Sequence, residues 1–407
     1  MSHFSKLDAS NYVPISLLNA GKCRSYALGL AAAFVAAGVR FDFVGGEEVN
    51  ALELHGSSSV KPLNLRGDQS AEAGFRQKLM RILTYYFRLI RYAAVAKPKV
   101  FHIMWNNKFE FFDRTLLMLY YKLLGKKIVL TAHNVNAGKR DGYDSFLNRL
   151  TLKIQYRLCD HIFVHTTKMK DELLVDFGVP EIRTSIIPHG VNYTVPNTAL
   201  TGAAARQQLG IGEREKVILF FGYIAPYKGL EFLVAAFDEI ARLDNNYRLI
   251  IAGEPKTPKD KDYWNRIKET IARSAANNRV IQKIEYIPDA ETEWYFKAAD
   301  VLALPYVHIF QSGVLFLSYS FGLPVIAADV GAMREEIIAG KTGNVFEAEN
   351  VPRLAQTLRE FFKSDLYQEL PRRRSEIKDY ADEKYSWKKI AALTTAVYAA
   401  VAGAQKK

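Results

Sequence analysis

A lysine beside a strand-to-helix turn is the first candidate for chemistry. In the segment FFGYIAPYKGLEFL (220–233), an apolar strand ends at Gly222 and a helix begins near Gly229. This spacing puts the Lys228 ammonium beside a helix N-terminus, and both features favour a bound anion such as a diphosphate. A turn glycine followed by a solvated surface lysine gives the same pattern, so the segment alone favours neither interpretation.

A second candidate anion site lies at the start of a later helix. In VLALPYVHIFQSGVLF (301–316), a strand leads through a loop into Gln311, Ser312, Gly313 and Val314. Ser312 is a favoured N-cap residue, and Gly313 lets a phosphate approach the N–H groups of the first helical turn. Ser312 can also cap its helix and contact nothing else, and the two roles are compatible.

A histidine in the first half of the chain also has a position typical of a site. In VLTAHNVNAGKR (129–140), His133 follows directly after a predicted strand. Parallel α/β sheets bind ligands at the carboxyl ends of their strands. We therefore favour a functional role for His133 over a structural one.

One pattern has the spacing of a metal site. Asp260 and Asp262 form an Asp-x-Asp pair, which can hold a divalent cation. The pair stands in the lysine-rich stretch KTPKDKDYW and not after an apolar strand, which favours a solvated surface. Cys23 and Cys159 suit neither a zinc site nor a disulfide framework and are typical of a reducing cytosol. We expect no metal and no other cofactor.

The elements that must position these residues alternate along the chain. Apolar strand-like runs are separated by helical stretches, which is typical of parallel sheets covered by helices on both faces. The predicted strands are 11–18, 40–44, 100–104, 127–132, 161–165 and 185–188, and then 216–222, 247–253, 280–287, 301–305, 324–329 and 343–346. Residues 192–215 interrupt the alternation as a linker does, and 351–407 are predicted to be helical.

This alternation predicts an α/β protein with two doubly wound, Rossmann-like domains facing each other across a cleft. We place an N-terminal domain at 1–195 and a C-terminal domain at 196–380. The last helix, 381–407 around Trp387, is expected to cross back onto the N-terminal domain.

Composition limits the possible classes of protein. The 407 residues are 49% hydrophobic and 24% charged, which excludes a disordered or fibrous chain. The net charge of +12 favours anionic partners, but dispersed charges and no recognised motif argue against nucleic acid. The longest apolar runs, 28–39 and 391–404, are shorter than the roughly 20 residues that span a bilayer. The N-terminus lacks a signal-peptide pattern, so we expect a cytoplasmic protein.

Several ordered segments together resemble glycosyltransferase family 4, which comprises retaining enzymes of the GT-B fold. The matching segments are IIPHGVNY (186–193), FFGYIAPYKG (220–229), IAGEP (251–255), YIPDAETEWYFKAADVLALPY (286–306) and GLPVIAADVGAMREEI (322–337). The resemblance is strong in the C-terminal half and looser in the N-terminal half. It implies transfer of a sugar from a nucleotide diphosphate sugar to a glycan or lipid-linked glycan acceptor. Exopolysaccharide, capsule or other cell-envelope glycan synthesis is the implied setting.

The resemblance also implies roles for individual residues. His133 and Lys228 would be catalytic, and Asn134, Lys139 and Arg140 would line the acceptor side. The donor would contact Gly21, Gly222, Tyr223, Lys228, Gly253, Glu254, Gln311, Ser312, Gly313 and Val314. No protein nucleophile is evident, so the implied reaction is a front-face substitution in which the leaving phosphate oxygen helps to deprotonate the acceptor. His189-Gly190 resembles a pair at the family's domain junction and can equally be a turn.

The sequence departs from the family pattern at three positions. Tyr223 stands where many members have an arginine, and Ile309 and Leu317 stand where the family has two glutamates. The QSGV start resembles a subgroup in which Gln-Ser-Gly takes over donor contacts. A non-catalytic partner subunit that binds the nucleotide sugar therefore remains an alternative. A nucleotide-sugar epimerase is a second alternative, disfavoured because the matching segments are those of transferases.

Residues 74–92 predict an amphipathic helix. Its apolar face would hold Phe75, Leu79, Ile82, Leu83, Tyr86, Leu89 and Ile90, and its basic face Arg81, Arg88 and Arg91. Such a helix can lie on an anionic membrane and bring the protein to a lipid-linked acceptor. Its apolar face can also pack on the sheet, which we favour. A peripheral location on the cytoplasmic side of a membrane is therefore a secondary expectation.

Overall fold

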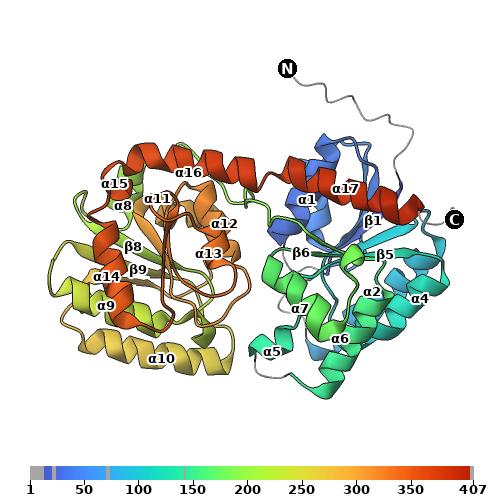
Figure 1. Cartoon of the computed structure of the whole chain (residues 1–407), viewed down its shortest axis with the longest axis horizontal. Helices are drawn as coiled ribbons and strands as arrows, with labels where there is room; N and C mark the ends of the chain where they lie inside the picture. The colour runs from blue at the N-terminus through green and yellow to red at the C-terminus, as the bar shows by residue number, and fades with distance from the viewer. Residues whose placement is uncertain (1–12, 21–23, 70–73, 142–143, 404–407) are drawn as a thin grey trace. The chain divides into compact units, whose positions relative to one another are not determined.

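The structure, a computed structural model, describes residues 13–20, 24–69, 74–141 and 144–403, with the side chains of Arg140 and Asp141 excluded. Two compact units divide the chain (Figure 1). The first unit comprises the chain up to Gly190 together with the segment from Tyr385 onward. The second unit is Val191–Lys384.

The first unit contains a seven-stranded sheet in which every neighbouring pair is parallel. The strand order is β3-β2-β1-β4-β5-β6-β7. The strands are β1 (Ile15–Leu18), β2 (Phe41–Gly45), β3 (Val60–Asn64), β4 (Val100–Ile103), β5 (Lys127–Thr131), β6 (His161–Val164) and β7 (Thr184–Ile186). The order reverses between β1 and β4, which is where sheets of this kind bind ligands.

Helices connect these strands, and the last helix of the chain joins the same unit. They are α1 (Arg24–Ala36), α2 (Phe75–Val95), α3 (Glu110–Phe112), α4 (Met118–Leu123), α5 (Ala137–Asp141), α6 (Phe146–Leu158), α7 (Thr167–Phe177) and α17 (Trp387–Gly403). Tyr398 of α17 bonds through its hydroxyl to His102 Nδ1 of β4 at 2.5 Å. The C-terminal helix is thereby fixed to the sheet of the first unit.

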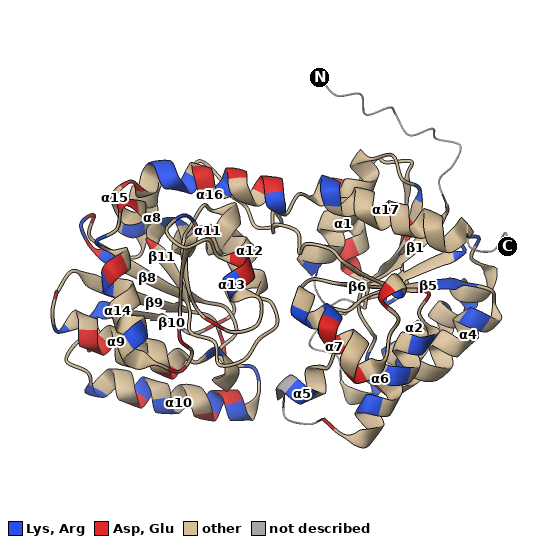
Figure 2. Ribbon diagram, viewed as in Figure 1, with Lys and Arg blue, Asp and Glu red and all other residues tan. Residues whose placement is uncertain are grey.

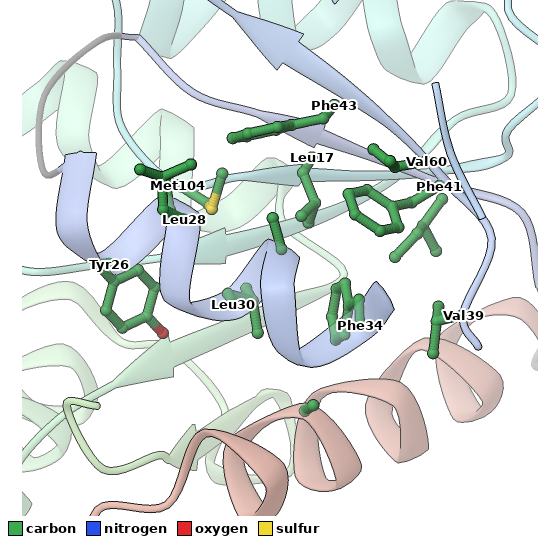
Figure 3. Close-up of a cluster of buried hydrophobic side chains, with 14 of the residues drawn as sticks. Leu17, Tyr26, Leu28, Leu30, Phe34, Val39, Phe41, Phe43, Val60 and Met104 are labelled. Carbon is green, nitrogen blue, oxygen red and sulfur yellow. The ribbon is translucent and has the colours of Figure 1, made fainter. Parts of the chain in front are cut away.

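The core of the first unit forms where α1 and α17 pack against β1, β2 and their neighbours. Leu30 and Phe34 of α1 are fully buried beside Leu17 and Phe43 of the sheet (Figure 3). Strands such as β1 and β6 are buried at every position, because a parallel sheet is covered on both faces. The predicted strands of this region are short apolar runs for this reason.

The second unit repeats the plan with a six-stranded parallel sheet of order β10-β9-β8-β11-β12-β13. Its strands are β8 (Lys216–Phe221), β9 (Tyr247–Ala252), β10 (Val280–Lys283), β11 (Val301–Leu304), β12 (Val325–Ala328) and β13 (Gly343–Phe346). Its helices are α8 (Gly202–Gln208), α9 (Leu230–Ala241), α10 (Pro258–Arg273), α11 (Asp289–Ala298), α12 (Gly313–Ser320), α13 (Met333–Glu336), α14 (Val351–Phe361), α15 (Asp365–Gln368) and α16 (Leu370–Lys384). Here the strand order reverses between β8 and β11.

The prediction of an α/β fold with two Rossmann-like parallel sheets is confirmed, and the differences are local. The sequence analysis missed β3, because Pro62 and exposed Lys61 disguise it, and both are tolerated because β3 is an edge strand. Helix α8 lies inside the expected linker. Within the described residues, no helix combines the length and apolarity that crossing a membrane would require.

Helix α2 corrects the expected division of its faces. Its packing face is formed by Tyr85, Tyr86, Leu89 and Ala93, which are buried. Four apolar residues of the i, i+4 series are instead exposed: Phe75 (81%), Leu79 (41%), Leu83 (50%) and Phe87 (66%). The expected apolar face is therefore buried only from Tyr85 onward, and its earlier members Phe75, Leu79 and Leu83 lie in solvent. A helix longer than the sheet edge it covers leaves its first turns in solvent.

Candidate functional site

Lys228 lies in the turn that joins β8 to α9 in the second unit. Lys228 is only 5% exposed, and its Nζ lies 5.6 Å from the ring centre of Tyr306. No carboxylate pairs with it in the described part of the chain. Burial, together with the charge of Lys256, lowers the pKa of Lys228 to about 7. A buried ammonium without a counterion is a strong candidate for binding an anion.

The two anion sites predicted separately converge on this lysine. A Cβ built on Gly222, at the end of β8, would lie 3.4 Å from Lys228 Nζ and 3.6 Å from Val314 Cγ2 of α12. Gly253, at the end of β9, has a φ of +147°, and a Cβ there would lie 1.9 Å from the Gly222 carbonyl oxygen. The two glycines therefore keep the ends of β8 and β9 close together beside the first turn of α12.

The N-terminus of α12 differs in one respect from the expectation. Ser312 occupies the N-cap position, but its hydroxyl accepts no hydrogen bond from the helix. Ser312 Oγ instead lies 3.1 Å from the hydroxyl oxygen of Tyr306, a residue in the loop after β11. The interpretation that the Ser312 side chain caps its helix was wrong. The hydrogen bond ties the helix start to the aromatic wall beside Lys228.

Gln311 carries an unsatisfied amide next to this helix start. Its Oε1 and Nε2 are both buried and have no hydrogen-bond partner in the described residues. A buried polar group without a partner costs about 1–3 kcal/mol. An amide with both a donor and an acceptor left over suits a polar ligand that supplies the complementary groups.

Asp260 serves a different purpose from the one that its Asp-x-Asp spacing suggested. Its carboxylate accepts hydrogen bonds from the Thr257 backbone N–H at 3.0 Å and from the Tyr223 hydroxyl. Thr257 and Asp260 form the capping box of α10. Tyr223, the residue that follows Gly222, is thereby turned toward α10. The expectation of metal independence stays a prediction.

In the first unit, three histidines follow three neighbouring strands. His133 comes after β5, His165 after β6 and His189 after β7. The ring centres of His133 and His165 are 4.8 Å apart, and those of His165 and His189 are 5.3 Å apart. Tyr26 of α1 packs edge-on against His133 at 4.7 Å. The strand ends thus carry a compact aromatic cluster.

A hydrogen-bonded chain determines which nitrogen of His133 carries its proton. His165 Nδ1 lies 3.0 Å from the Ile187 carbonyl oxygen and must therefore donate to it. The neutral ring of His165 then accepts at Nε2, which lies 3.0 Å from His133 Nδ1. His133 consequently donates through Nδ1, which leaves an unprotonated Nε2 that is buried and without a partner in the described chain.

Burial keeps the histidines of this cluster neutral. It lowers the pKa of His165 to about 3 and that of His189 to about 4. The pKa of His133 also falls well below its usual value, mainly through burial and then through the neighbouring His165, although the Met104 carbonyl opposes the shift. The free Nε2 of His133 is thus an acceptor suited to a hydroxyl group, not a cation suited to a phosphate.

A pocket in the first unit surrounds His133. Asn134 lines it together with His133, and Trp105, Asn106 and Gln155 complete its polar wall. Trp105 stacks on His133 with ring centres 5.2 Å apart. The pocket therefore offers a stacking surface and several amides around the His133 acceptor, which suits a hydroxyl-rich molecule.

Two family models match the two halves of the chain. The model described as "Glycosyltransferase Family 4" matches residues 24–195, and the model described as "Glycosyl transferases group 1" matches residues 203–383. The chain belongs to the glycosyltransferases of the group 1 and family 4 type. The family resemblance inferred from the motifs is confirmed at this level.

Relatives and solved structures agree with this assignment. The glycosyltransferase is 27% identical over 252 residues to a D-inositol 3-phosphate glycosyltransferase of Corynebacterium efficiens, covering 58% of each chain. It is 26% identical over 246 residues to an uncharacterized glycosyltransferase of Methanocaldococcus jannaschii, covering 60% of each. The matched stretch thus spans little more than half the length of these curated relatives.

The fold is shared over nearly the full chain with solved GT-B proteins. Sucrose-phosphate synthase from Thermosynechococcus elongatus superposes with a TM-score of 0.73 at 18% identity, covering 96% of this chain and 99% of that one. Anabaena HepE in complex with UDP superposes with a TM-score of 0.72 at 16% identity, covering 96% and 100%. The GT-B fold of this glycosyltransferase, expected from the sequence, is therefore confirmed.

Of the other predicted site residues, the structure places Glu254 beside the Gly222 turn and Lys139 outside the lining of the His133 pocket. Lys139 does not line the His133 pocket and lies 3.8 Å from Asp176 in an exposed ion pair. Glu254 contributes its backbone carbonyl to Ile224 at 3.0 Å, beside the Gly222 turn. Gly21 and the side chain of Arg140 lie outside the described residues.

Two positions that depart from the family pattern are buried in the second unit. Ile309 is 9% exposed and Leu317 is 6% exposed. Gly331 packs against the Ile309 backbone, since a Cβ there would lie 2.0 Å from the Ile309 carbonyl oxygen. Both apolar side chains thus belong to the interior of the second unit.

Sequence analysis missed the partners of His133. His165 ends the run HIFVH, and Trp105 follows β4, so each occupies a strand end in the same sheet as His133. That shared position was the available signal. Tyr26 comes from α1 and gave no signal, because only the packing of α1 on the sheet brings it to His133.

Proposed function

We propose that this glycosyltransferase moves a sugar from a nucleotide diphosphate sugar to a glycan or lipid-linked glycan, with retention at the anomeric carbon. The observation that carries the proposal is the convergence of Lys228 Nζ, Gly222 and the first turn of α12 in the second unit. A diphosphate there would give the buried ammonium its counterion. HepE, a protein of the same fold, has been solved with UDP and with UDP-glucose, which supports this donor class.

In the proposed reaction, positively charged groups stabilise the leaving diphosphate, and hydrogen bonds hold the donor. Lys228 and the N–H groups of α12 would stabilise negative charge on the departing diphosphate. The Gln311 amide would bond to polar groups of the donor. His133 Nε2 would accept a hydrogen bond from a sugar hydroxyl. The acceptor would be deprotonated by the leaving phosphate oxygen, with cell-envelope glycan synthesis as the proposed setting.

Release of nucleoside diphosphate from nucleotide sugars tests this function. Purified protein is first screened with nucleotide diphosphates and their sugars for ligands that raise its melting temperature. The ligand with the largest effect is then followed for slow hydrolysis. We expect nucleoside diphosphate to accumulate with the wild type and to fall roughly ten- to hundredfold with Lys228→Met. Substitution of exposed Lys363 by Met serves as the control and should leave the rate unchanged.

A non-catalytic partner subunit is the second candidate function. Buried Ile309 and Leu317 favour it, since neither can contact a ligand hydroxyl, and Tyr223 is engaged by Asp260. Donor binding with no release of nucleoside diphosphate, even with added acceptor glycans, would support this candidate over the enzyme.

We also propose that α2 attaches the protein to an anionic membrane. The exposed series Phe75, Leu79, Leu83 and Phe87 forms an apolar stripe, defined here as the α2 stripe. Helix α2 carries five basic residues and no acidic one. An apolar stripe flanked by basic side chains matches the chemistry of an anionic bilayer surface.

Flotation with vesicles tests this attachment. Vesicles of phosphatidylcholine with added phosphatidylglycerol should carry the wild type upward. Replacing Leu83 and Phe87 by Ser should abolish flotation, whereas the same change at exposed Leu243, in the turn after α9, and Val175 of α7 should not. Equal flotation of all three proteins would remove α2 as the attachment site.

A further inference from the structure

A second lysine lies close to the candidate diphosphate site of the second unit. Lys256 stands in the loop between β9 and α10, four residues after the end of β9. Its side chain is exposed. No carboxylate forms an ion pair with Lys256 among the residues that the structure describes. Lys256 has no role in the reaction proposed above, although it brings a positive charge to the edge of the sheet where Lys228 lies.

The loops after β8 and β9 run side by side, which brings Lys256 toward Lys228. The backbone N–H of Ile224 donates to the Glu254 carbonyl at 3.0 Å, two residues before Lys256. This bond continues the parallel pairing of β8 with β9 beyond the ends of both strands. The two lysines therefore follow neighbouring strands at the same edge of the sheet, which is the edge where parallel sheets bind ligands.

The ring of Tyr223 positions Lys256. Lys256 Nζ lies 5.6 Å from the centre of this ring, within the range of a cation–π contact. The Tyr223 hydroxyl donates to the Asp260 carboxylate. The same carboxylate accepts from the Thr257 backbone N–H at 3.0 Å, in the capping box of α10. The ring that carries the ammonium group of Lys256 is thus anchored to the first turn of α10.

The charges of the two lysines act on each other. Tyr223 follows Gly222 directly, and a Cβ on Gly222 would lie 3.4 Å from Lys228 Nζ. The ammonium over the Tyr223 ring adds to the effect of burial in lowering the pKa of Lys228. Two like charges repel each other unless an anion lies between them. A diphosphate esterified at both ends, as in a nucleotide sugar, carries two negative charges and therefore matches two ammonium groups.

We propose that Lys256 is the second cation of the diphosphate site. This inference rests on the proposed function and adds a donor-binding residue to it. Tyr223 stands where many family members have an arginine, but its presence does not leave the site with a single cation. Its ring carries a lysine that comes from the loop after the neighbouring strand. Tyr223 is a positioning residue in this arrangement, and Lys256 contacts the donor.

Binding of diphosphates to charge variants tests the role of Lys256. UDP, inorganic pyrophosphate and uridine are titrated calorimetrically into the wild type and into Lys256→Met, Lys256→Arg and Lys261→Met. Lys261 is the matched control because it is also exposed and lies on α10, where Figure 2 shows basic and acidic positions in alternation. Lys256→Arg retains both the positive charge and the ability to lie over an aromatic ring.

We expect Lys256→Met to bind UDP and pyrophosphate roughly tenfold more weakly than the wild type, with uridine binding unchanged. Lys256→Arg should bind both diphosphates nearly as tightly as the wild type, and Lys261→Met should bind them equally well. Equal binding by Lys256→Met and Lys261→Met overturns the proposal. A loss with Lys256→Met that Lys256→Arg shows in full also overturns it.

A double-mutant cycle tests Tyr223 as the positioning residue. Tyr223→Leu removes the aromatic ring that carries the ammonium group. We expect this change to weaken UDP binding severalfold in the wild type and to have no further effect in Lys256→Met, because the ring then has no ammonium to position. The same loss in both backgrounds would contradict the positioning role, since a merely structural effect of Tyr223 does not depend on Lys256.

The two diphosphate probes separate this proposal from the proposed function. If pyrophosphate distinguishes Lys256→Met from Lys261→Met while UDP does not bind to the wild type, the nucleotide donor has failed and Lys256 has not. If Lys228→Met weakens UDP binding and Lys256→Met does not, the donor site stands and the second cation has failed. If the wild type binds neither UDP nor pyrophosphate, both proposals are overturned.

Discussion

At the level of single residues, burial decides what Lys228 and His133 can do. The same burial that lowers the pKa of Lys228 to about 7 leaves its charge without a counterion. In the His133 chain, the Ile187 carbonyl determines the proton positions of two rings. The sequence identified Lys228 and His133 through their places after strands. It could not reveal the pKa or the proton position, because both depend on groups more than 20 residues away.

The lowered pKa of Lys228 predicts a pH-dependent donor affinity. Only the protonated lysine attracts a diphosphate, so affinity should fall as the pH rises through about 7. UDP-glucose is a suitable probe, since its esterified diphosphate does not titrate there. We expect the dissociation constant to rise roughly tenfold or more between about pH 6.5 and about pH 8.5. Calorimetry with Lys228→Met as the control should give a much flatter profile. A wild-type profile as flat as that of the variant contradicts this role.

At the level of elements, close approach of strand ends builds the candidate donor site. Gly222 and Gly253 end neighbouring strands, and only glycine allows the contact between them. The sequence predicted both strands and both glycines. The sequence did not show that Gly222 and Gly253 contact each other, because that contact follows from the pairing of β8 with β9.

Gly253→Ala should therefore damage both stability and the site. Its Cβ would overlap the Gly222 carbonyl oxygen, and its φ of +147° disfavours any side chain. We expect the free energy of unfolding to fall by about 2–4 kcal/mol and donor affinity to fall with it. Gly212→Ala, where the nearest atom would be 3.5 Å from the new Cβ, is the matched control. Denaturant unfolding that does not distinguish the two variants would contradict the packing described.

Trp387, the first residue of α17, also inserts its side chain into the first unit. Trp387 fills the space where Gly29 of α1 and Gly190 have no Cβ, with a new Cβ at either position 2.2 Å from the indole. A bulky ring therefore occupies a slot made by two glycines. The sequence placed Trp387 on a helix packing toward the first domain but gave no sign of the slot.

Gly29→Ala and Trp387→Ala should be strongly non-additive. Gly29→Ala alone should lower the free energy of unfolding by about 1–3 kcal/mol, because the new methyl group overpacks the site. Trp387→Ala alone should lower it by about 3–5 kcal/mol, because the indole ring is lost. In the double variant the new methyl group meets no indole, so the combined loss should be smaller than the sum. Gly403→Ala, which meets no atom within 4 Å, is the neutral control. Simple additivity in denaturant unfolding would argue against the slot.

Strand β3 and helix α2 show where sequence patterns do not suffice to predict the structure. Pro62 hid the edge strand β3, because proline usually argues against a strand. The apolar periodicity of α2 predicts a packing face but cannot tell how much of the helix is covered. Only the observed burial separates the packing face around Tyr86 from the exposed α2 stripe.

At the level of the whole molecule, two parallel sheets built on the same plan account for the shared fold. The strand order reverses between β1 and β4 in the first sheet and between β8 and β11 in the second, and each candidate site lies at the carboxyl ends of strands. The alternation of apolar runs predicted this plan because parallel strands are buried throughout. The donor, the acceptor and the membrane surface were not predictable in detail, because pocket shape and exposure arise only in the folded chain.

The central claim is that a diphosphate binds between Lys228 and the start of α12. Calorimetric titration of UDP and of uridine into the wild type and Lys228→Met tests it most directly. The claim predicts that the variant binds UDP roughly ten- to hundredfold more weakly, while the weak binding of uridine, which has no phosphate, stays the same. UDP binding of equal strength to both proteins, or an equal loss for UDP and uridine, would contradict it.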